Sequence, residues 1–174
     1  MRPVPKMTWD AATYFKQLTL TNKLAQDNHF FYCDISGLGS MEEVISNMKN
    51  MTAFVAVNNT EGGTTFLDNA PFATRSKGLF FGMRHLQNNM PARQECIDIM
   101  SEIYRQFNSR MLRDEETILD EKTKFNRQQR LQVIDRYLNT EWTILFAEIG
   151  TQTYFDMCYN ADDWLTPNSN EANA

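Results

Sequence analysis

The segment "EWTILFAEI", residues 141–149, decides the fold class because apolar side chains alternate along it. Successive side chains of a β-strand point to opposite faces of a sheet. The alternation places two sets of three side chains on opposite faces: Trp142, Ile144 and Phe146, and Leu145, Ala147 and Ile149. The segment is therefore predicted to be a strand, and Gly150 is predicted to turn the chain into a further strand over 151–159.

Other segments before and after the middle of the chain also have strand character. Aromatic and β-branched residues favour strands, and they are frequent in "HFFYCDI" (29–35), "MTAFVAVNN" (51–59), "TTFLD" (64–68) and "SKGLFFGMRHL" (76–86). The first of these is predicted to be buried on both faces. "NNTEGG" is a turn by composition and Pro71 is a break, so 51–86 is predicted to be an antiparallel meander. Order is expected to resume at "LQVIDRYL" (131–138).

Apolar residues at helical spacing predict three helices. The first begins after Thr8 as N-cap, with Asp10 in its first turn, and ends near Asn28. A capping box of Ser40 and Glu43 begins the second, and Pro91 opens a long third helix. The apolar stripes are, in order, Ala11, Phe15, Leu18 and Ala25; Met41, Val44, Ile45 and Met48; and Ile97, Met100, Tyr104, Phe107 and Met111.

This order of elements predicts an α+β fold with a mainly antiparallel sheet, with the N-terminal helix and the long central helix packed on one face. The length of 174 residues fits one domain, which we place at residues 1–164. Prolines at positions 3 and 5 predict an extended arm over 1–7. The Asn- and Ala-rich residues 165–174 are predicted to be a disordered tail.

Composition and charge bear on the classes of partner. The net charge of −5 gives no basic footprint, so specific nucleic-acid recognition is not expected. The first fifteen residues lack the apolar stretch of a signal peptide, and no apolar run spans a bilayer, so we expect a soluble intracellular product without membrane contact. The odd count of cysteines predicts reduced thiols at Cys33, Cys96 and Cys158.

Motifs for catalysis, cofactors or metals are weak. "DISGLGSMEE" (34–43) resembles the start of a dinucleotide-binding turn, but Glu42 and Glu43 would repel a pyrophosphate. Adjacent aspartates at 162–163 are more often a turn than a metal site. We predict no enzyme, no cofactor and no metal. An unrecognised active site around His29, Cys33 and Asp156 remains an alternative.

The stretch "RDEETILDEKTKFNRQQR", residues 113–130, carries five acidic and five basic side chains. We expect a projecting helix or a solvated loop there rather than packed core. One subunit's basic stretch could meet a neighbour's acidic one, although a solvated loop without a partner explains the composition equally well. The predicted oligomer interface consists of Arg113, Asp114, Glu115, Glu116, Lys122, Lys124, Arg127 and Arg130.

The order of elements, with the helix "PARQECIDIMSEIYRQF" (91–107) and the closing segment "FDMCYNADDW" (155–164), resembles small proteins of phages and prophages of Bacteroides-like bacteria. Met157 and Ala161 depart from their common ending, "LCYDP..W". The order also resembles phage tail-terminator and tail-completion proteins, which join head and tail at the neck.

The resemblance implies a structural virion protein of the head–tail connector that forms a ring, a hexamer by analogy, at the end of the tail tube. Its partners would be further copies and other tail or connector proteins, with no reaction and no cofactor. It would be located in the virion after assembly in the bacterial host cytoplasm. The alternatives are another phage or contractile-machine adaptor subunit, a small soluble binding module without catalysis, or the enzyme mentioned above.

Overall fold

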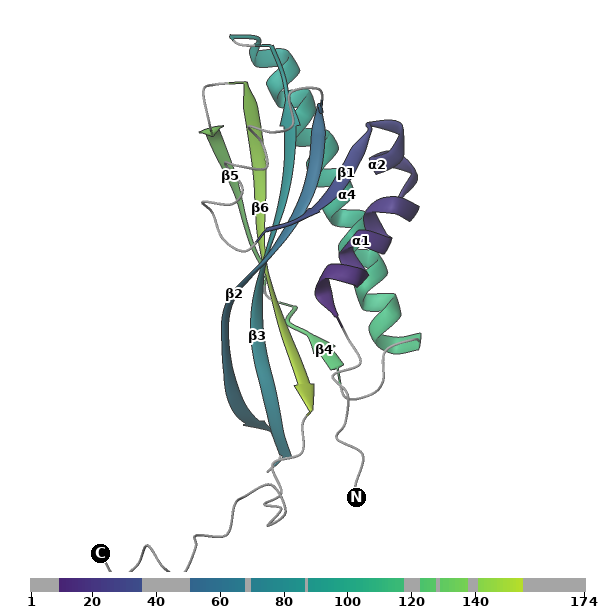
Figure 1. Cartoon of the computed structure of the whole chain (residues 1–174), viewed down its shortest axis with the longest axis vertical. Coiled ribbons are helices and arrows are strands. Elements are labelled where there is room, and N and C mark those ends of the chain that lie inside the picture. The colour runs from purple at the N-terminus through teal and green to yellow at the C-terminus, as the bar shows by residue number, and fades with distance from the viewer. Residues whose placement is uncertain are drawn as a thin grey trace, which may run out of the picture.

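The computed structural model describes residues 10–35, 51–67, 70–86, 88–117, 123–127, 129–137 and 141–154 and has an α+β fold (Figure 1). Its helices are α1 (Ala11–Thr21), α2 (Lys23–Asp27) and α4 (Met90–Thr117). Its strands are β1 (Phe30–Asp34), β2 (Ala53–Leu67), β3 (Ala70–Arg84), β4 (Thr123–Phe125), β5 (Arg130–Tyr137) and β6 (Trp142–Tyr154). The predicted fold class is confirmed.

The six strands form one sheet in the order β1-β2-β3-β6, with β4 and β5 both pairing with the far side of β6. β1 runs parallel to β2, and every other pairing is antiparallel. β5 pairs with β6 between Trp142 and Glu148, and β4 pairs with Thr151–Thr153. The two strands therefore lie end to end along β6 and form one edge of the sheet.

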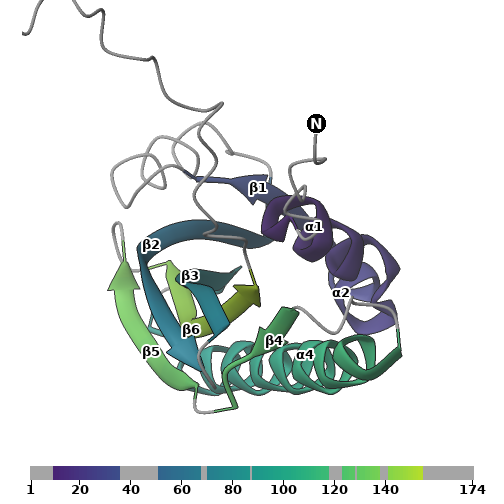
Figure 2. The same cartoon turned by 90° about the horizontal axis from the view of Figure 1, so that it is seen from below.

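The sheet has a helix-side face and an outer face. Figure 2 shows α1, α2 and α4 on the same side of the sheet, as predicted. The core on the helix-side face contains Leu145, Ala147 and Ile149, whereas Trp142 and Ile144 belong to a second apolar cluster on the outer face, with Phe146 packed against it. The alternation along 141–149 therefore predicted both faces of β6 correctly.

The N-terminal helix begins and ends differently from the prediction. Asp10 is its N-cap, because the Asp10 side chain accepts a hydrogen bond from the Thr13 backbone N–H at 2.8 Å. A break at Asn22 separates α1 from α2, and the Asn22 side chain caps α2 by accepting from Ala25 N. Short polar side chains satisfy the free N–H groups of a helix start. The observed cap therefore lies two residues after the predicted one, and the helix is interrupted before Asn28.

The long helix α4 has the predicted apolar face. Its buried side chains are Cys96, Met100, Ile103, Phe107 and Met111, and the partly buried Ile97 and Tyr104 pack beside them. Phe107 lies between α1 and the sheet, with its ring centroid 6.5 Å from Phe15 and 5.5 Å from Phe81. This face anchors α1 and the sheet to one common core.

The meander predicted for 51–86 is wrong in detail, because the structure has two long strands instead of three short ones. β2 continues through "NNTEGG" with only a bulge between Asn59 and Glu61. Pro71 is inside β3, where it pairs in register with Phe66 near the end of the hairpin. Proline is tolerated near strand ends and at edges. Pairing along the whole hairpin therefore overrides the local turn signals.

Glycines in β3 and β6 allow close packing rather than turns. A Cβ atom on Gly82 would lie 2.2 Å from the ring of Phe54 on the neighbouring strand, so the ring occupies the space above the glycine. β3 shows no bulge at Gly78 or Gly82. Gly150 does not turn the chain either, because β6 runs through it to Tyr154. The turn predicted at Gly150 is therefore wrong.

Several predictions concern residues outside the described part of the chain. They are the arm over 1–7, the Thr8 cap, the helix beginning at Ser40, Lys122, Asp156, Cys158, the closing segment 155–164 and the tail 165–174.

Candidate interaction edge of the sheet

The charged stretch 113–130 folds back onto the sheet. Its first residues continue α4 to Thr117, residues 123–125 form β4, and Arg130 begins β5. Asp114, Thr123 and Phe125 are buried. The prediction that this stretch lies outside the packed core is therefore wrong for these residues. A single aspartate and a single phenylalanine within a charged sequence gave no apolar pattern that could have revealed the burial.

Asp114 is a buried charged residue in this stretch, with 3% of its surface exposed. Its carboxylate accepts hydrogen bonds from the Tyr14 hydroxyl at 2.9 Å and from Arg110 Nε at 2.7 Å. Burial and the bond to Asp114 raise the pKa of Tyr14 above its ordinary value. Asp114 thus connects α1 to α4, and its side chain is not available at the predicted oligomer interface.

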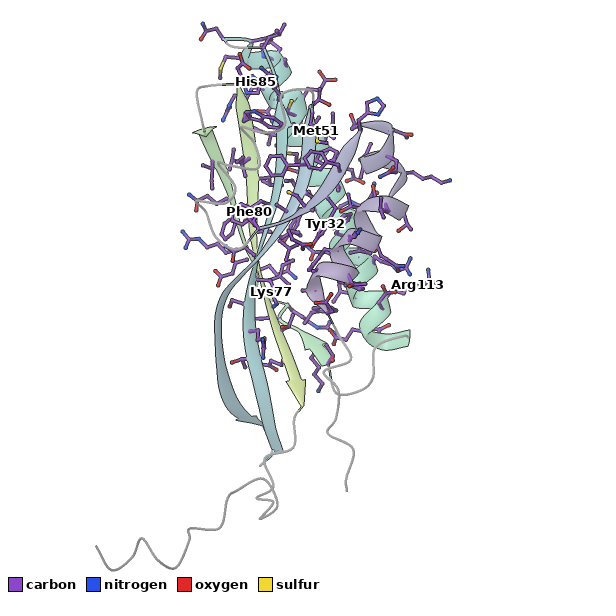
Figure 3. The ribbon with its side chains drawn as sticks, in the orientation of Figure 1. Tyr32, Met51, Lys77, Phe80, His85 and Arg113 are labelled. Atoms are coloured by element: carbon purple, nitrogen blue, oxygen red, sulfur yellow. The ribbon has the colours of Figure 1, made fainter. Side chains whose placement is uncertain are left out.

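Glu115 is also used inside the molecule. Its side chain accepts a hydrogen bond from the Phe125 backbone N–H at 2.9 Å, which connects the end of α4 to β4. The Phe125 ring packs near Tyr14, with the ring centroids 6.2 Å apart. Arg113 and Glu116 are exposed on the last turns of α4, and Figure 3 shows Arg113 on the side of the helix layer away from the strands. Two of the three described acidic side chains therefore hold the chain together.

The connection between β4 and β5 is fixed against the sheet. Asn126 N donates to Gly150 O at 2.7 Å, and a Cβ atom on Gly150 would lie 2.9 Å from Asn126 Cβ. The Tyr104 hydroxyl donates to Gln129 Oε1 at 2.5 Å, which ties the connection to α4. β4, the connection and β5 therefore act as one interrupted edge strand. Interruptions of this kind at sheet edges re-aim side chains.

The basic half of the stretch is exposed on this edge. Lys124 lies in β4, Arg127 in the connection and Arg130 at the start of β5, and all three are exposed. Arg130 pairs in register with Glu148. Within the described residues none of the three cations forms an ion pair. The structure therefore brings three of the predicted interface residues, all basic and exposed, to one edge of the sheet, which we call the basic edge.

β5 also has exposed apolar side chains, on the face of the sheet opposite to Arg130. Leu131 and Val133 lie two residues apart, opposite Ala147 and Leu145 in register, and are 45% and 38% exposed. Large aliphatic side chains this exposed on an edge strand leave apolar surface for a partner to cover. The sequence pattern did not single them out, although their alternation in "RLQVI" could have indicated them.

Two polar groups near the N-terminus of α1, the Lys77 amine and the Tyr32 hydroxyl, were also not predicted from the sequence. Lys77 is 6% exposed on β3, and its burial and the charge of Arg75 lower its pKa, against the effect of Asp10. The Tyr32 hydroxyl donates to Asp34 Oδ1 at 2.7 Å, and burial raises the pKa of Tyr32. Figure 3 shows Tyr32 and Lys77 on neighbouring parts of the molecule. The burial of Lys77 could have been predicted from the sequence, because Lys77 alternates with the apolar residues Leu79 and Phe81 and therefore shares their face of the strand.

Two residues of the enzyme alternative, His29 and Cys33, lie in the described part of the chain. His29 lies in the turn before β1 rather than in the strand, with φ of 56°, and is exposed. Burial and the charge of Asp34 raise the pKa of Cys33 to about 12, so its thiol is protonated at neutral pH. His85, near the end of β3, has Nε2 3.0 Å from Thr143 Oγ1. In the described part of the chain neither histidine forms a hydrogen bond with Cys33.

Searches of the described residues gave no group of three or more histidine, cysteine or acidic side chains that could hold a metal ion. Among the described helices none has the length and apolar character to cross a membrane. No known family model matches the sequence, and no curated protein matches it either.

Proposed function

We propose that this protein is a structural subunit of a phage head–tail connector, which assembles into a homo-oligomeric ring and has no catalytic activity. The observation that best supports a homo-oligomer is the basic edge. Its side chains Lys124, Arg127 and Arg130 are exposed, and the edge strand β5 also has exposed apolar side chains. Opposite charge on a partner steers association and fixes its register. The phage assignment is supported by the resemblance in element order and in the closing segment.

The internal use of the acidic half supports the same proposal. Asp114 and Glu115 hold α1 and β4 to α4, so these two carboxylates do not neutralise the cations of the edge. A partner that offers negative charge at this edge would therefore complement it. A chain with a net charge of −5 has acidic groups elsewhere that a second copy can offer.

The test is the solution mass of the full-length chain by light scattering at low and at high ionic strength, with negative-stain electron microscopy of the larger species. Charges at an exposed edge are screened over about 10 Å at 0.1 M salt. We expect a ring with a central channel at low salt that dissociates as salt is added. A chain that is a monomer at every ionic strength, or a compact dimer without a channel, contradicts the proposal.

A control distinguishes the basic edge from charge in general. Lys16 and Lys23 are exposed on α1 and α2, far along the chain from the edge. Replacing Arg127 and Arg130 with glutamate is expected to abolish the ring, whereas replacing Lys16 and Lys23 with glutamate changes the net charge equally and is expected to leave it intact. Equal loss in both variants would show that overall charge, not the edge, controls assembly.

A further inference from the structure

We infer that copies of this chain join head to tail through opposite edges of the sheet, with the β4–β5 edge of one copy pairing with residues 58–67 of β2 in the next, where no described strand of its own chain pairs. This inference rests on the proposed homo-oligomeric function and names the surfaces that would carry it. Pairing of strand edges across two chains is a common mode of protein association.

The first surface is the long edge of β2. β1 pairs with β2 only from Ala53 to Val57. From Asn58 to Leu67, none of the described strands pairs with β2 on the side away from β3. Figure 1 shows this half of the hairpin extending beyond the end of β1. A strand edge of this length presents backbone donors and acceptors to another chain.

The second surface is the outer side of β5. In the described part of the chain β5 pairs with β6 alone, so its other side has no partner. An added strand would lie about 4.8 Å away, and its side chains would cover the exposed parts of Leu131 and Val133. Backbone hydrogen bonds and aliphatic contact would therefore form together on this edge.

Charge makes the two edges complementary. Residues 123–137 contain Lys124, Arg127, Arg130 and Arg136 against one acid, Asp135. The stretch of β2 from Asn58 to Leu67 contains one charged residue, the acidic Glu61. Like charges directly opposite destabilise a strand pair, and opposite charges stabilise it. Two basic edges would repel, so the occupant of the basic edge is the acidic edge of a second copy.

The contact has a consequence for symmetry. The two edges differ, so each copy offers one edge to the copy before it and the other to the copy after it. A head-to-tail contact of this kind closes into a ring when the rotation between copies permits it. Sheet-edge pairing therefore explains how one chain could build the proposed ring without a second protein.

The experiment uses the full-length chain with complementary charge reversals, Arg130→Glu and Glu61→Lys. Each variant alone would set like charges against each other at every contact, and we expect its mass to fall from that of the ring to that of one chain. In an equimolar mixture the acidic β5 edge of one variant meets the basic β2 edge of the other. We expect the mixture to recover the assembled mass, as alternating copies.

Two further measurements complete the experiment: one checks folding and the other tests the aliphatic side chains of the edge. Circular dichroism checks that each variant keeps the fold. The double variant Leu131→Lys/Val133→Lys tests the aliphatic part of the edge, with Leu86→Lys as control because Leu86 is 76% exposed near the end of β3. We expect the double variant to lower the assembled fraction at least tenfold and the control to leave it unchanged.

The outcomes separate this inference from the proposed function. Recovery of assembly in the mixture supports pairing of opposite edges. An oligomer that withstands both charge reversals and the double variant overturns the edge pairing and leaves the ring proposal standing. A wild-type chain that is monomeric under all conditions overturns both.

Discussion

The stretch 113–130 contains five acidic and five basic residues, and among those that the structure describes two acids and three cations lie in contrasting places. The acidic residues Asp114 and Glu115 are turned inward, where they bind Tyr14, Arg110 and the backbone of Phe125. The basic residues Lys124, Arg127 and Arg130 are exposed along the sheet edge. Equal numbers of acidic and basic residues in the sequence therefore do not show that these two acids and these three cations lie in different places in the structure.

The difference follows from what each side chain can do when buried. A carboxylate can accept several hydrogen bonds at once and so be satisfied inside the fold. Burying a lysine or arginine requires a matched acceptor for each donor. Interior positions near the end of α4 suit acids that receive donors from α1 and β4, and the cations remain at the edge. The four predictions below test the contrast between the inward-facing interior and the exposed edge.

The largest expected effect is at Phe125, which fixes β4 to the core. Phe125→Ala removes a side chain that is 5% exposed, and we expect a loss of about 3–5 kcal/mol in the free energy of unfolding, measured by urea denaturation. Lys124→Ala, the exposed neighbour in the same strand, is the matched control and should change it by less than about 0.5 kcal/mol. Similar effects at the two positions would mean that β4 is not anchored to the core.

The next effect is at Asp114. The Arg110 side chain is half exposed, so the ion pair contributes little, and most of the loss comes from the hydrogen bond of Tyr14. Asp114→Ala should destabilise by about 2 kcal/mol, because the partly buried Tyr14 hydroxyl loses its acceptor. In combination with Tyr14→Phe the loss should be less than additive. Glu116→Ala, exposed two residues on, is expected to be neutral. Additive losses would contradict the contact.

A smaller effect is expected at Gly150, where the connection between β4 and β5 approaches β6. Gly150→Ala would place a Cβ atom 2.9 Å from Asn126 Cβ. The connection must shift, and we expect a loss of about 1–2 kcal/mol in thermal or urea unfolding. Asn126→Gly in the same chain should recover part of it. A neutral Gly150→Ala variant would show that the connection does not lie as closely on β6 as described.

The smallest effect at neutral pH comes from the thiol of Cys33. Its pKa is raised to about 12 from 9.0, so the folded state holds this proton more tightly than the unfolded state. Its contribution to stability is complete below about pH 9 and is lost as the pH rises towards 12. Urea denaturation of the wild type and of Cys33→Ala across this range should show a steeper decline in the wild type. Parallel curves would indicate an exposed thiol.

Periodic patterns in the sequence predicted the packed elements well. The alternation in 141–149 assigned both faces of β6, and the spacing from Ile97 to Met111 identified the core face of α4. Both patterns are direct consequences of burial on a regular element. They therefore survive in a single sequence without any knowledge of the partner elements.

Features that depend on distant partners were not predicted. "NNTEGG" has the composition of a turn but lies in β2, because pairing with β3 satisfies its backbone. The burial of Asp114 depends on a hydroxyl one hundred residues away in the chain. The composition singled out these basic residues, but their place on an edge of the sheet depends on the return of the chain as β4 and was not predicted. Contacts of this kind leave no periodic trace in the sequence.

The most direct test of sheet-edge assembly is hydrogen–deuterium exchange of the full-length chain, assembled at low salt and dissociated at high salt. Pairing of edges predicts slower exchange in the assembled state for peptides covering 130–134 and 58–67. Peptides from the centre of β6 should exchange equally slowly in both states, because they are already paired. Unchanged exchange at both edges in an assembled sample would contradict the account.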